Sequence, residues 1–328
     1  MILIITGKKD RHANFVIDKM EQRGVEYVRL NAEDFPQRVS IPIQNSLEQN
    51  GNYLVLPNEK CINLKKVKSV WYRKPLPPDI NEITENQRIK EFILKECNAF
   101  LGGLWEMLDC LWVNRPSRIK IANYKSYQLQ LAKEIGFEIP STIITNNPEA
   151  VRKFYNTYGG NIVVKTLWQT LIEQDNKVFA MYTKRVNLEM LEKLNSLHLG
   201  PAIFQEKIEK KFELRVIVIG EKIFACEIHS QESERTKEDW RRYDFTNVPH
   251  RPHALPLKIS NLCITMIKRL GLSFGAFDLI LTPDGHYIFL EINPNGQWGW
   301  IELLTGLPIS TTLIDFLLNQ SNLKSARN

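Results

Sequence analysis

Alternating apolar and polar positions divide the chain into three predicted modules, of which the first covers residues 1–115. It opens with the apolar run "MILIIT", a predicted buried strand, and continues with an amphipathic helix over residues 11–23 that ends before Gly24. Further strands are predicted in "VEYVRLN", at residues 39–43 and 53–56, and in "VKSVWYRK". A long helix from about residue 86 to residue 110 follows. Strands that alternate with helices in this way predict a small α/β domain with a parallel sheet.

The second predicted module covers residues 116–200 and mixes helices with short strands. A helix over residues 123–135 ends at Gly136, and "NNPEAVRKFY" has the Asn cap and early Pro of another helix start. Strands are predicted in "EIPSTIIT", in "GGNIVVK", and in "TLIEQ" and "KVFAMYTK", which flank the polar turn "DN". A helix over residues 187–197 completes the module, which reads as an α+β subdomain.

The third predicted module, residues 201–328, is richer in strands. "AIFQEKI" is a strand, and "KKFELRVIVIGEKIFACEIHSQ" is two strands joined around Gly220 and Glu221. A polar loop, "ESERTKEDWRRYD", separates them from the helix "LKISNLCITMIKRLG". The strands "AFDLILT" and "HYIFLEIN" then form a hairpin around the turn "PDG".

The end of this hairpin carries an unusual group of polar side chains. Strand alternation places Tyr287, Phe289, Glu291 and Asn293 on one face. With an even number of loop residues, Asp278 lies opposite Phe289 and is a diagonal neighbour of Glu291. Two carboxylates and an amide oxygen would then converge, and such hard oxygen ligands suit Mg²⁺ together with phosphate oxygens and water. An ordinary hairpin with solvated polar residues is the alternative.

Residues elsewhere in the chain favour the metal site. Lys125 and Lys165 stand on a helix and at a strand end, and "FQEKIEKKFELR" reads as strand, polar hinge and strand, with Glu213 and Arg215 on one face. Either lysine alone also fits a solvated surface position. Together with the hairpin they supply what phosphoryl transfer needs, namely cations for the phosphates, a metal, and a hinge backbone for adenine.

This combination resembles the ATP-grasp superfamily, specifically the RimK-like carboxylate ligases. The motifs that carry the resemblance are Lys125, Lys165 after "NIVV", "FQEKI", "ELRVIVIG", "FDLIL" and "FLEINPNG". The resemblance implies an α/β (α+β) ATP-grasp fold, in which a pre-grasp α/β domain precedes two α+β subdomains that clasp ATP. It also implies phosphate binding by Lys125 and Lys165, adenine binding by Gln205, Glu206, Lys207 and Ile208, ribose binding by Glu213, stabilisation of the transferred phosphoryl group by Arg215, and binding of two Mg²⁺ ions by Asp278, Glu291 and Asn293.

A narrower resemblance covers nearly the whole chain. "VWYRK", "NPEAVRKFY", "IHSQ", "DWR" and "YIFLEINP" are similar to the maturases of microviridin-type peptides, the graspetide ligases. These enzymes form side-chain esters or amides in a ribosomal precursor peptide with a leader and an acidic core. The similarity adds Arg241 to the triphosphate and acyl-phosphate site, and residues 170–195 are a candidate leader dock. "NPNGQWGWIELLTGLPIS" departs from the microviridin enzymes, so the substrate subgroup stays open.

Several alternatives stay open beside this interpretation. A RimK-like ligase could act on free amino acids or a protein terminus, and a degenerate relative could bind nucleotide without catalysis. Arg241 could belong to a solvated basic loop beside Arg242. A strand-end His229 fits a hydrogen-bonded role better than that of a catalytic base. The aromatic residues Trp298 and Trp300 fit a substrate channel and simple packing equally well.

Composition sets outer limits on these interpretations. The chain has 328 residues, 43% of them hydrophobic, which is enough for two or three domains. A net charge of +6 suits anionic ligands but is too diffuse for a nucleic-acid groove. There is no run of 18 apolar residues, so no membrane span is expected. Five scattered cysteines favour reduced thiols in the cytoplasm. A homodimer is one assembly that the sequence leaves open.

Overall fold

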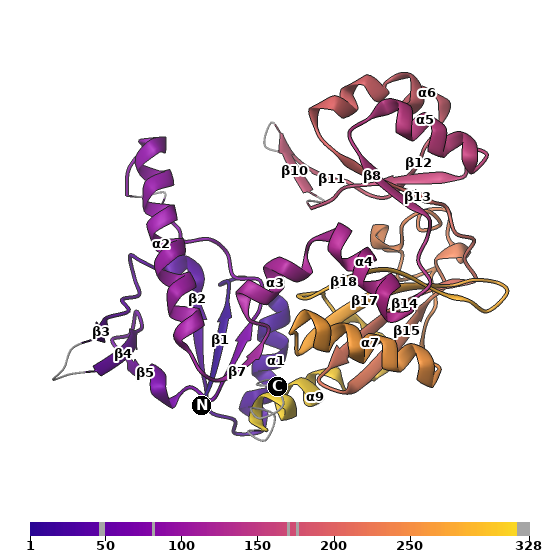
Figure 1. Cartoon of the computed structure of the whole chain (residues 1–328). Helices are drawn as coiled ribbons and strands as arrows, with labels where there is room; N and C mark the ends of the chain where they lie inside the picture. The colour runs from indigo at the N-terminus through magenta and orange to yellow at the C-terminus, as the bar shows by residue number, and fades with distance from the viewer. Residues whose placement is uncertain (46–49, 81–82, 169–170, 175–176, 320–328) are drawn as a thin grey trace. The chain divides into compact units, whose positions relative to one another are not determined.

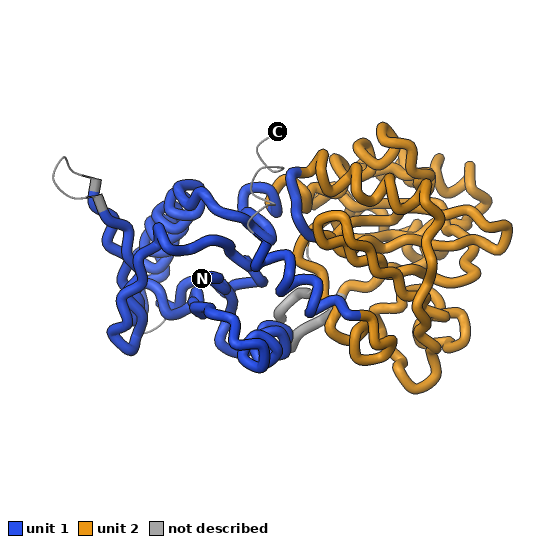
Figure 2. The backbone as a smooth tube through the Cα atoms, turned by 90° about the horizontal axis from the view of Figure 1, so that it is seen from below, with its two compact units in different colours: residues 1–119, 271–274, 308–328 blue, residues 120–270, 275–307 orange. Residues whose placement is uncertain are grey.

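The computed structural model describes residues 1–45, 50–80, 83–168, 171–174 and 177–319. The chain divides into two compact units (Figure 2). Unit 1 comprises residues 1–119, 271–274 and 308–328, and unit 2 comprises residues 120–270 and 275–307. The division into three modules, with boundaries after residues 115 and 200, stays a prediction. Among the described residues, no helix is long and apolar enough to cross a membrane.

Unit 1 is built on the predicted parallel sheet. Its four strands lie in the order β2 (Tyr27–Asn31), β1 (Ile2–Thr6), β6 (Ser69–Tyr72) and β7 (Leu111–Val113), and all neighbours are parallel. The helices of this unit include α1 (Arg11–Gln22), α2 (Gln87–Met107) and α9 (Ile309–Leu318), and α3 (Pro116–Ala122) leads into unit 2 (Figure 1). Short 3-10 helices cover Ala32–Asp34 and Leu64–Lys66.

Local chemistry explains the ends of α1 and its place in unit 1. The Asp10 carboxylate caps the helix by accepting the N–H groups of His12 and Ala13. Past the last turn, Gly24 has a φ of 64°, which glycine adopts without a steric penalty. On the side of α1, the Lys19 ammonium group donates a hydrogen bond to the Ser310 hydroxyl of α9 at 2.7 Å. This bond ties the C-terminal helix back to the start of the chain.

A small antiparallel sheet accompanies the parallel one, in the order β3 (Ile43–Asn45), β4 (Asn50–Val55) and β5 (Cys61–Asn63). The predicted position of the strand at residues 39–43 is wrong. Only Ser40 forms an isolated bridge, to Val55, and the continuous strand starts at Ile43. Pro42 has no N–H to donate to a ladder, which accounts for the break.

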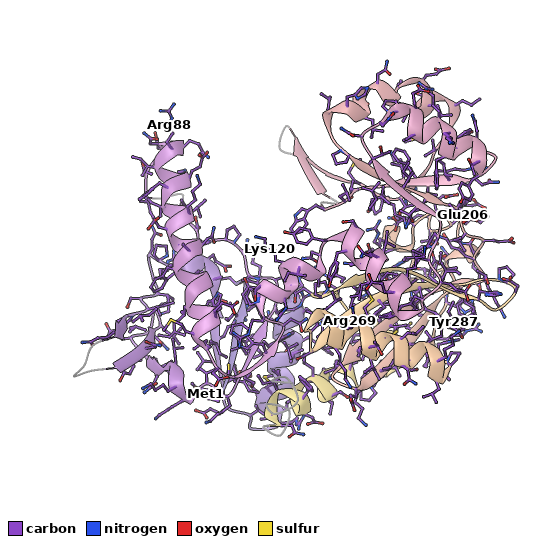
Figure 3. All side chains as sticks on the ribbon, viewed as in Figure 1. Met1, Arg88, Lys120, Glu206, Arg269 and Tyr287 are labelled. Atoms are coloured by element: carbon purple, nitrogen blue, oxygen red, sulfur yellow. The ribbon has the colours of Figure 1, made fainter. Side chains whose placement is uncertain are left out.

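Unit 2 contains two larger sheets. The first has the order β12 (Lys184–Arg185), β9 (Ile162–Lys165), β13 (Ala202–Glu206) and β8 (Thr142–Thr145). Its core packs against α5 (Pro148–Thr157) and the segment with α6 (Leu188–Glu192) and the 3-10 helix Leu194–Leu199. Glu206, labelled in Figure 3, ends β13. A separate antiparallel pair, β10 (Leu171–Gln174) and β11 (Lys177–Ala180), confirms the predicted strand pair, although residues 175–176 between them lie outside the described residues.

The second sheet of unit 2 has five strands. Their order is β16 (His250–His253), β15 (Lys222–Ile228), β14 (Phe212–Ile219), β17 (Phe274–Leu281) and β18 (Tyr287–Asn293). The helices α4 (Lys125–Ile135) and α7 (Leu257–Leu270) lie beside this sheet (Figure 1). The helix α8 (Gly299–Thr305) follows β18 in the chain. Short 3-10 helices cover Ser230–Glu232 and Trp240–Arg242 in the predicted polar loop. The strands β14, β15, β17 and β18 confirm the predicted hairpins.

Candidate active site

A pocket of about 680 Å³, counting its open mouth, lies within unit 2. Both sheets contribute strand ends to it, and the loop after β15 completes it. Its lining consists of Pro140, Val163, Lys165, Thr183, Gln205, Glu206, Lys207, Ile208, Lys210, Glu213, Glu238, Asp239, Trp240, Arg241, Asp278, Ile280, Leu290 and Glu291. Most of the residues that the sequence singled out are therefore brought together. The exceptions are Lys125, Arg215 and Asn293, which are not part of the lining.

The register of the predicted metal hairpin differs from expectation. Asp278 lies directly opposite Glu291 and not opposite Phe289, because a β-bulge interrupts the ladder beyond the Leu279–Phe289 pair. Leu290 and Glu291 both line the pocket, whereas Phe289 is buried. The predicted common face of Phe289 and Glu291 is thus wrong. Bulges of this kind re-aim side chains next to functional sites.

Packing on the other face of the hairpin accounts for this bulge. The Phe289 ring lies 5.2 Å from the ring of Phe137 and 6.3 Å from that of Phe277, measured between centroids. Its backbone N–H donates to the Glu138 carbonyl at 2.8 Å on the outer edge of β18. With Phe289 held in the core, the extra residue allows both Leu290 and Glu291 to face the pocket, so that the two carboxylates become direct neighbours.

Each carboxylate of this pair is held by its own cation. Arg215 donates to Asp278 at 2.9 Å, and Lys125 donates to Glu291 at 2.6 Å. Burial raises the pKa of Asp278 against the opposing charge of Arg215. Desolvation also acts on Glu291, but the charges of Lys125 and Arg241 outweigh it and hold the pKa of Glu291 well below its usual range. Glu291 is therefore anionic at neutral pH, and a metal or phosphate group would meet a fixed charge pattern.

Arg215 lies behind Asp278 in a closely packed corner. Its Nη2 donates to the Gln297 carbonyl at 3.3 Å, and its Nε is buried without a hydrogen-bond partner. A Cβ on Gly296 would come within 2.3 Å of both Arg215 Nη2 and the Cβ of Ala276. The glycine of "NPNG" thus allows the guanidinium to approach the backbone. The third predicted metal ligand, Asn293, uses its Oδ1 to accept the N–H of Asn295 at 2.9 Å.

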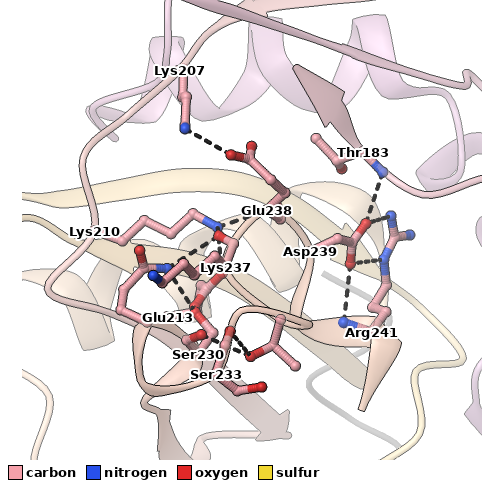
Figure 4. A network of polar contacts seen from close by, with 12 residues as sticks. Thr183, Lys207, Lys210, Glu213, Ser230, Ser233, Lys237, Glu238, Asp239 and Arg241 are labelled. Atoms are coloured by element: carbon pink, nitrogen blue, oxygen red, sulfur yellow. Dashed lines mark hydrogen bonds and ion pairs between the residues drawn. The ribbon is translucent and has the colours of Figure 1, made fainter. Parts of the chain in front are cut away.

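A polar network closes one wall of the pocket (Figure 4). Glu213 accepts a hydrogen bond from Lys210 at 2.7 Å and another from the Ser230 hydroxyl. Burial raises the pKa of Glu213 in spite of the Lys210 charge. Lys207 reaches Glu238 at 2.8 Å. Glu213 and Lys207 are therefore both tied to the loop after β15, which carries Ser230 and Glu238.

The same loop orients Arg241. Asp239 accepts from Arg241 Nε at 2.8 Å and Nη2 at 2.5 Å, and it also accepts the backbone N–H of Thr183 at 2.9 Å (Figure 4). Although burial opposes it, this bidentate pairing raises the pKa of Arg241, so its charge is permanent. Arg241 lies in the predicted polar loop beside Arg242, and its side chain, 32% exposed, lines the pocket. Sequence reasoning missed Asp239 as a site residue, although its place two residues before Arg241 was a usable signal.

One part of the pocket lining is apolar. The side chains of Pro140, Val163, Ile208, Ile280 and Leu290 line it, and none of them was predicted except Ile208. Beside them, the hinge leaves β13 at Gln205 and Glu206, where the Gln205 amide donates to the Thr142 hydroxyl at 3.0 Å. An apolar slot edged by backbone is suited to a planar heterocyclic base. Among the polar lining residues, Lys210 and Glu238 were also missed. Lys210 lies in the hinge segment itself, whereas only the fold brings Glu238 to the hinge.

Lys165 lies at the end of β9, where the pocket encloses it. Burial lowers the pKa of Lys165 to about 8, although the charge of Glu291 opposes the shift. His229, in contrast, has the hydrogen-bonded role that its strand-end position favoured, with Nε2 2.8 Å from Glu227 Oε2.

Comparisons with known proteins match this geometry over almost all of the chain. The MvdD pre-ATP grasp domain family matches residues 1–120, and the RimK-like ATP-grasp domain family matches residues 122–317. A RiPP-associated ATP-grasp ligase from Chryseobacterium gregarium, solved in complex with ADP and a leader and core peptide, has a TM-score of 0.88 and 31% identity. That similarity covers 97% of this chain and 96% of the other.

Two further relatives extend the comparison. The macrocyclase MdnC of Microcystis aeruginosa MRC, bound with the precursor peptide MdnA, has a TM-score of 0.86 and 32% identity over 97% of this chain and 99% of its own. A probable alpha-L-glutamate ligase of Trichodesmium erythraeum is 24% identical over 220 residues, which are 65% of this chain and 69% of the relative.

These matches confirm the predicted ATP-grasp fold with its pre-grasp domain, and they confirm the resemblance to microviridin-type maturases. The RimK-like match alone covers more than half of the sequence, and it includes all of the pocket-lining residues. The chain belongs to the RimK-like ATP-grasp family and is an ATP-grasp ligase.

Proposed function

We propose that this ligase works in the cytoplasm on a ribosomal precursor peptide and joins side chains of its acidic core into ester or amide rings. The observation that carries the proposal is the pocket in which Lys165, Arg241, Asp278 and Glu291 converge beside an apolar slot. Its support is the likeness, over nearly the whole chain, to ligases solved with leader, core or precursor peptides. The five free cysteines suit a reducing compartment.

The nucleotide would lie across the pocket from the slot to the charged end. Pro140, Val163 and Leu290 would sandwich the adenine, and the backbone of residues 205–208 would bind its edge. Glu213, fixed by Lys210 and Ser230, would accept the ribose hydroxyl groups. Lys165 and Arg241 would bind the triphosphate, with Lys125 behind Glu291.

The carboxylate pair fits Mg²⁺ on chemical grounds. Asp278 and Glu291 are direct neighbours across the hairpin, and the raised pKa of Asp278 reflects an environment that disfavours two bare negative charges. The described residues contain no group of three or more His, Cys, Asp or Glu side chains able to hold a metal. A site with few protein oxygens is the kind that Mg²⁺ occupies together with phosphate oxygens and water. Asp278, Glu291 and Asn293 would hold two ions, which would neutralise charge on the phosphates when bound.

The reaction then has two steps. An Asp or Glu side chain of the peptide attacks the γ-phosphorus of ATP, which gives an acyl phosphate and ADP. A hydroxyl or amine of the same peptide attacks the acyl carbon, the carbon–oxygen bond to phosphate breaks, and phosphate and a proton leave. Arg215 and Arg241 stabilise the charge that develops on the transferred group, and the rest of the site contributes positioning.

A leader segment would dock away from this chemistry and raise the local concentration of the core. The proposed dock is the segment 170–195, which includes β10, β11 and α6. Residues 170 and 175–176 of that segment lie outside the described residues. The excess of basic residues in the chain suits an acidic core.

The rival function is a ligase for free amino acids, which the similarity to a probable glutamate ligase favours. The experiment that separates the two is incubation of the enzyme with MgATP and a candidate precursor rich in Thr, Asp and Glu, followed by mass spectrometry. Each ring should remove one water from the peptide. A mass gain equal to an amino-acid residue in the presence of amino acids would support the rival, and ATP turnover on small acids with no peptide change would overturn the proposal.

Nucleotide binding is expected to take up a proton through Lys165. Because burial lowers its pKa to about 8, roughly half of the Lys165 amines are neutral at pH 8 in the protein without nucleotide. The triphosphate favours the charged form, so binding at pH 8 should take up about half a proton, and binding at pH 6 should take up almost none through this group. Calorimetry in two buffers of different ionisation enthalpy measures this uptake.

The variant Lys165→Met is expected to lose the uptake and to bind nucleotide about tenfold more weakly. The surface variant Lys268→Met, whose lysine pairs with Glu221 in solvent, is the matched control and should behave as the wild type. Equal proton uptake at pH 8 by Lys165→Met and the wild type would show that another group is responsible.

A further inference from the structure

A cluster of five aromatic rings stands on the loop after β15, the first residue of β16 and the start of α8. Trp300 is its centre, with ring centroids 5.5 Å from Trp240, 6.1 Å from Phe245 and 5.3 Å from His250. Tyr243 stacks on Phe245 at 5.2 Å and meets Trp240 edge-on at 5.7 Å. We call these five residues, Trp240, Tyr243, Phe245, His250 and Trp300, the aromatic wall.

The aromatic wall is continuous with the charged end of the pocket. Trp240 is one of the pocket-lining residues, and the Arg215 guanidinium lies 5.9 Å above its ring. Burial raises the pKa of the Tyr243 phenol, and the charges of Arg215, Asp278 and Arg241 all act on this group. The wall therefore borders the charged part of the pocket, where the acyl phosphate would form.

Two features distinguish the wall from an ordinary packed core. Its outer rings are open to solvent, with Tyr243 38% and Phe245 48% exposed, whereas the neighbouring Trp298 is 1% exposed and serves packing. Tyr243 also has a φ of 44°, a strained conformation for a residue with a side chain. Such strain is typical of ligand clamps and active sites. The two interpretations of Trp298 and Trp300 thus separate, since only Trp300 belongs to the exposed cluster.

We propose that the aromatic wall holds the peptide segment that carries the attacking hydroxyl or amine, and that it thereby keeps water from the acyl phosphate. The proposal rests on the proposed function. Ring faces contact the backbone and the methyl group of a threonine well, and they also accommodate the ammonium group of a lysine. Hydrolysis of the acyl phosphate returns the free carboxylate and releases phosphate. Each hydrolysis event therefore consumes one ATP without forming a ring.

The measurement is the number of ADP molecules released per ring formed, from a coupled ADP assay and mass spectrometry of the same reaction. The variant Tyr243→Gly removes a ring of the wall while glycine accepts the positive φ, so the loop keeps its backbone conformation. We expect its ADP-to-ring ratio to rise at least about threefold over the wild type. Tyr243→Phe keeps the ring and should match the wild type, as should Tyr53→Ala, which removes an equally exposed tyrosine outside the wall.

The outcomes separate the two claims. If Tyr243→Gly releases the same number of ADP molecules per ring as the wild type, the wall does not have the proposed role, and the proposed function is unaffected. If Tyr243→Phe raises the ADP-to-ring ratio as much as Tyr243→Gly does, the effect comes from the hydroxyl group and not from the ring. That result would also overturn the role of the wall. A wild-type enzyme that forms no rings with any candidate precursor while it turns over ATP on small acids would refute the proposed function, and the role of the wall with it.

Discussion

Glu291→Gln is expected to lower ADP formation at least about a thousandfold while the protein stays folded. The change keeps the size of the side chain and removes one of the two facing carboxylates on the hairpin. It leaves the charges of Lys125, Lys165 and Arg241, which all act on Glu291, without their common counter-charge. The triphosphate would then bind with the wrong charge pattern around it, and Mg²⁺ would lose an anionic ligand.

The cost in stability is expected to be moderate, about 1–3 kcal/mol. Lys125 and Glu291 are 21% and 28% exposed in their side chains, so solvent screens part of the ion pair, but the lowered pKa of Glu291 shows that its charge stabilises the folded state. A thermal melt and an Mg²⁺ titration of ADP binding check the two halves of the prediction. Glu221→Gln is the matched control, because that glutamate also pairs with a lysine, at 2.8 Å, but on the surface. Turnover of Glu291→Gln near the wild-type rate would refute its role.

Arg215→Met is expected to abolish turnover and to destabilise the protein more than Glu291→Gln does, by about 3–5 kcal/mol at pH 7. The Arg215 and Asp278 side chains are only 6% and 10% exposed, so the variant leaves a buried carboxylate without its cation. Burial already raises the pKa of Asp278, and loss of Arg215 would raise it further. A raised carboxyl pKa in the folded state costs stability above that pKa, so the defect should shrink as the pH falls.

A double variant separates the structural from the chemical effect. Arg215→Met with Asp278→Asn removes the unpaired charge, and urea unfolding should show that most of the lost stability returns. Activity should not return, because both the phosphoryl-stabilising cation and a metal ligand are missing. If the double variant is no more stable than Arg215→Met at pH 7, the uncompensated carboxylate is not the cause.

The sequence predicted the elements with strong local signals. The apolar run at Ile2–Thr6, the capped helix at Arg11–Gln22 and the hairpin strands Phe274–Leu281 and Tyr287–Asn293 all lie where periodicity placed them. The segments without such signals were missed. The strand His250–His253 contains a proline and no alternation, and it exists only because it pairs with β15. The helix Ile309–Leu318 is tied to α1 by contacts across almost the whole chain, such as Arg23 with Asp315 at 2.6 Å.

The candidate site shows the same division between local and distant causes. Lys165, Glu213 and Glu291 stand on strands whose pattern is local, so their convergence could be expected. The bulge at Leu290 could not, because it depends on how Phe289 packs against Phe137, more than a hundred residues earlier in the chain. Asp239 is a mixed case, because its pairing with Arg241 is local, whereas its contact with the Thr183 N–H requires the loop to fold onto the other sheet.

The most direct test of the account follows one oxygen atom. A precursor peptide whose Asp and Glu side chains carry oxygen-18 is incubated with the enzyme and MgATP, and the released phosphate is analysed by mass spectrometry beside the peptide. Ring formation through an acyl phosphate moves one carboxylate oxygen to phosphate, so one labelled phosphate should appear for each water lost from the peptide. Rings that form with unlabelled phosphate would contradict the account. So would labelled phosphate from a peptide that forms no ring and only exchanges one labelled carboxylate oxygen for an oxygen of water.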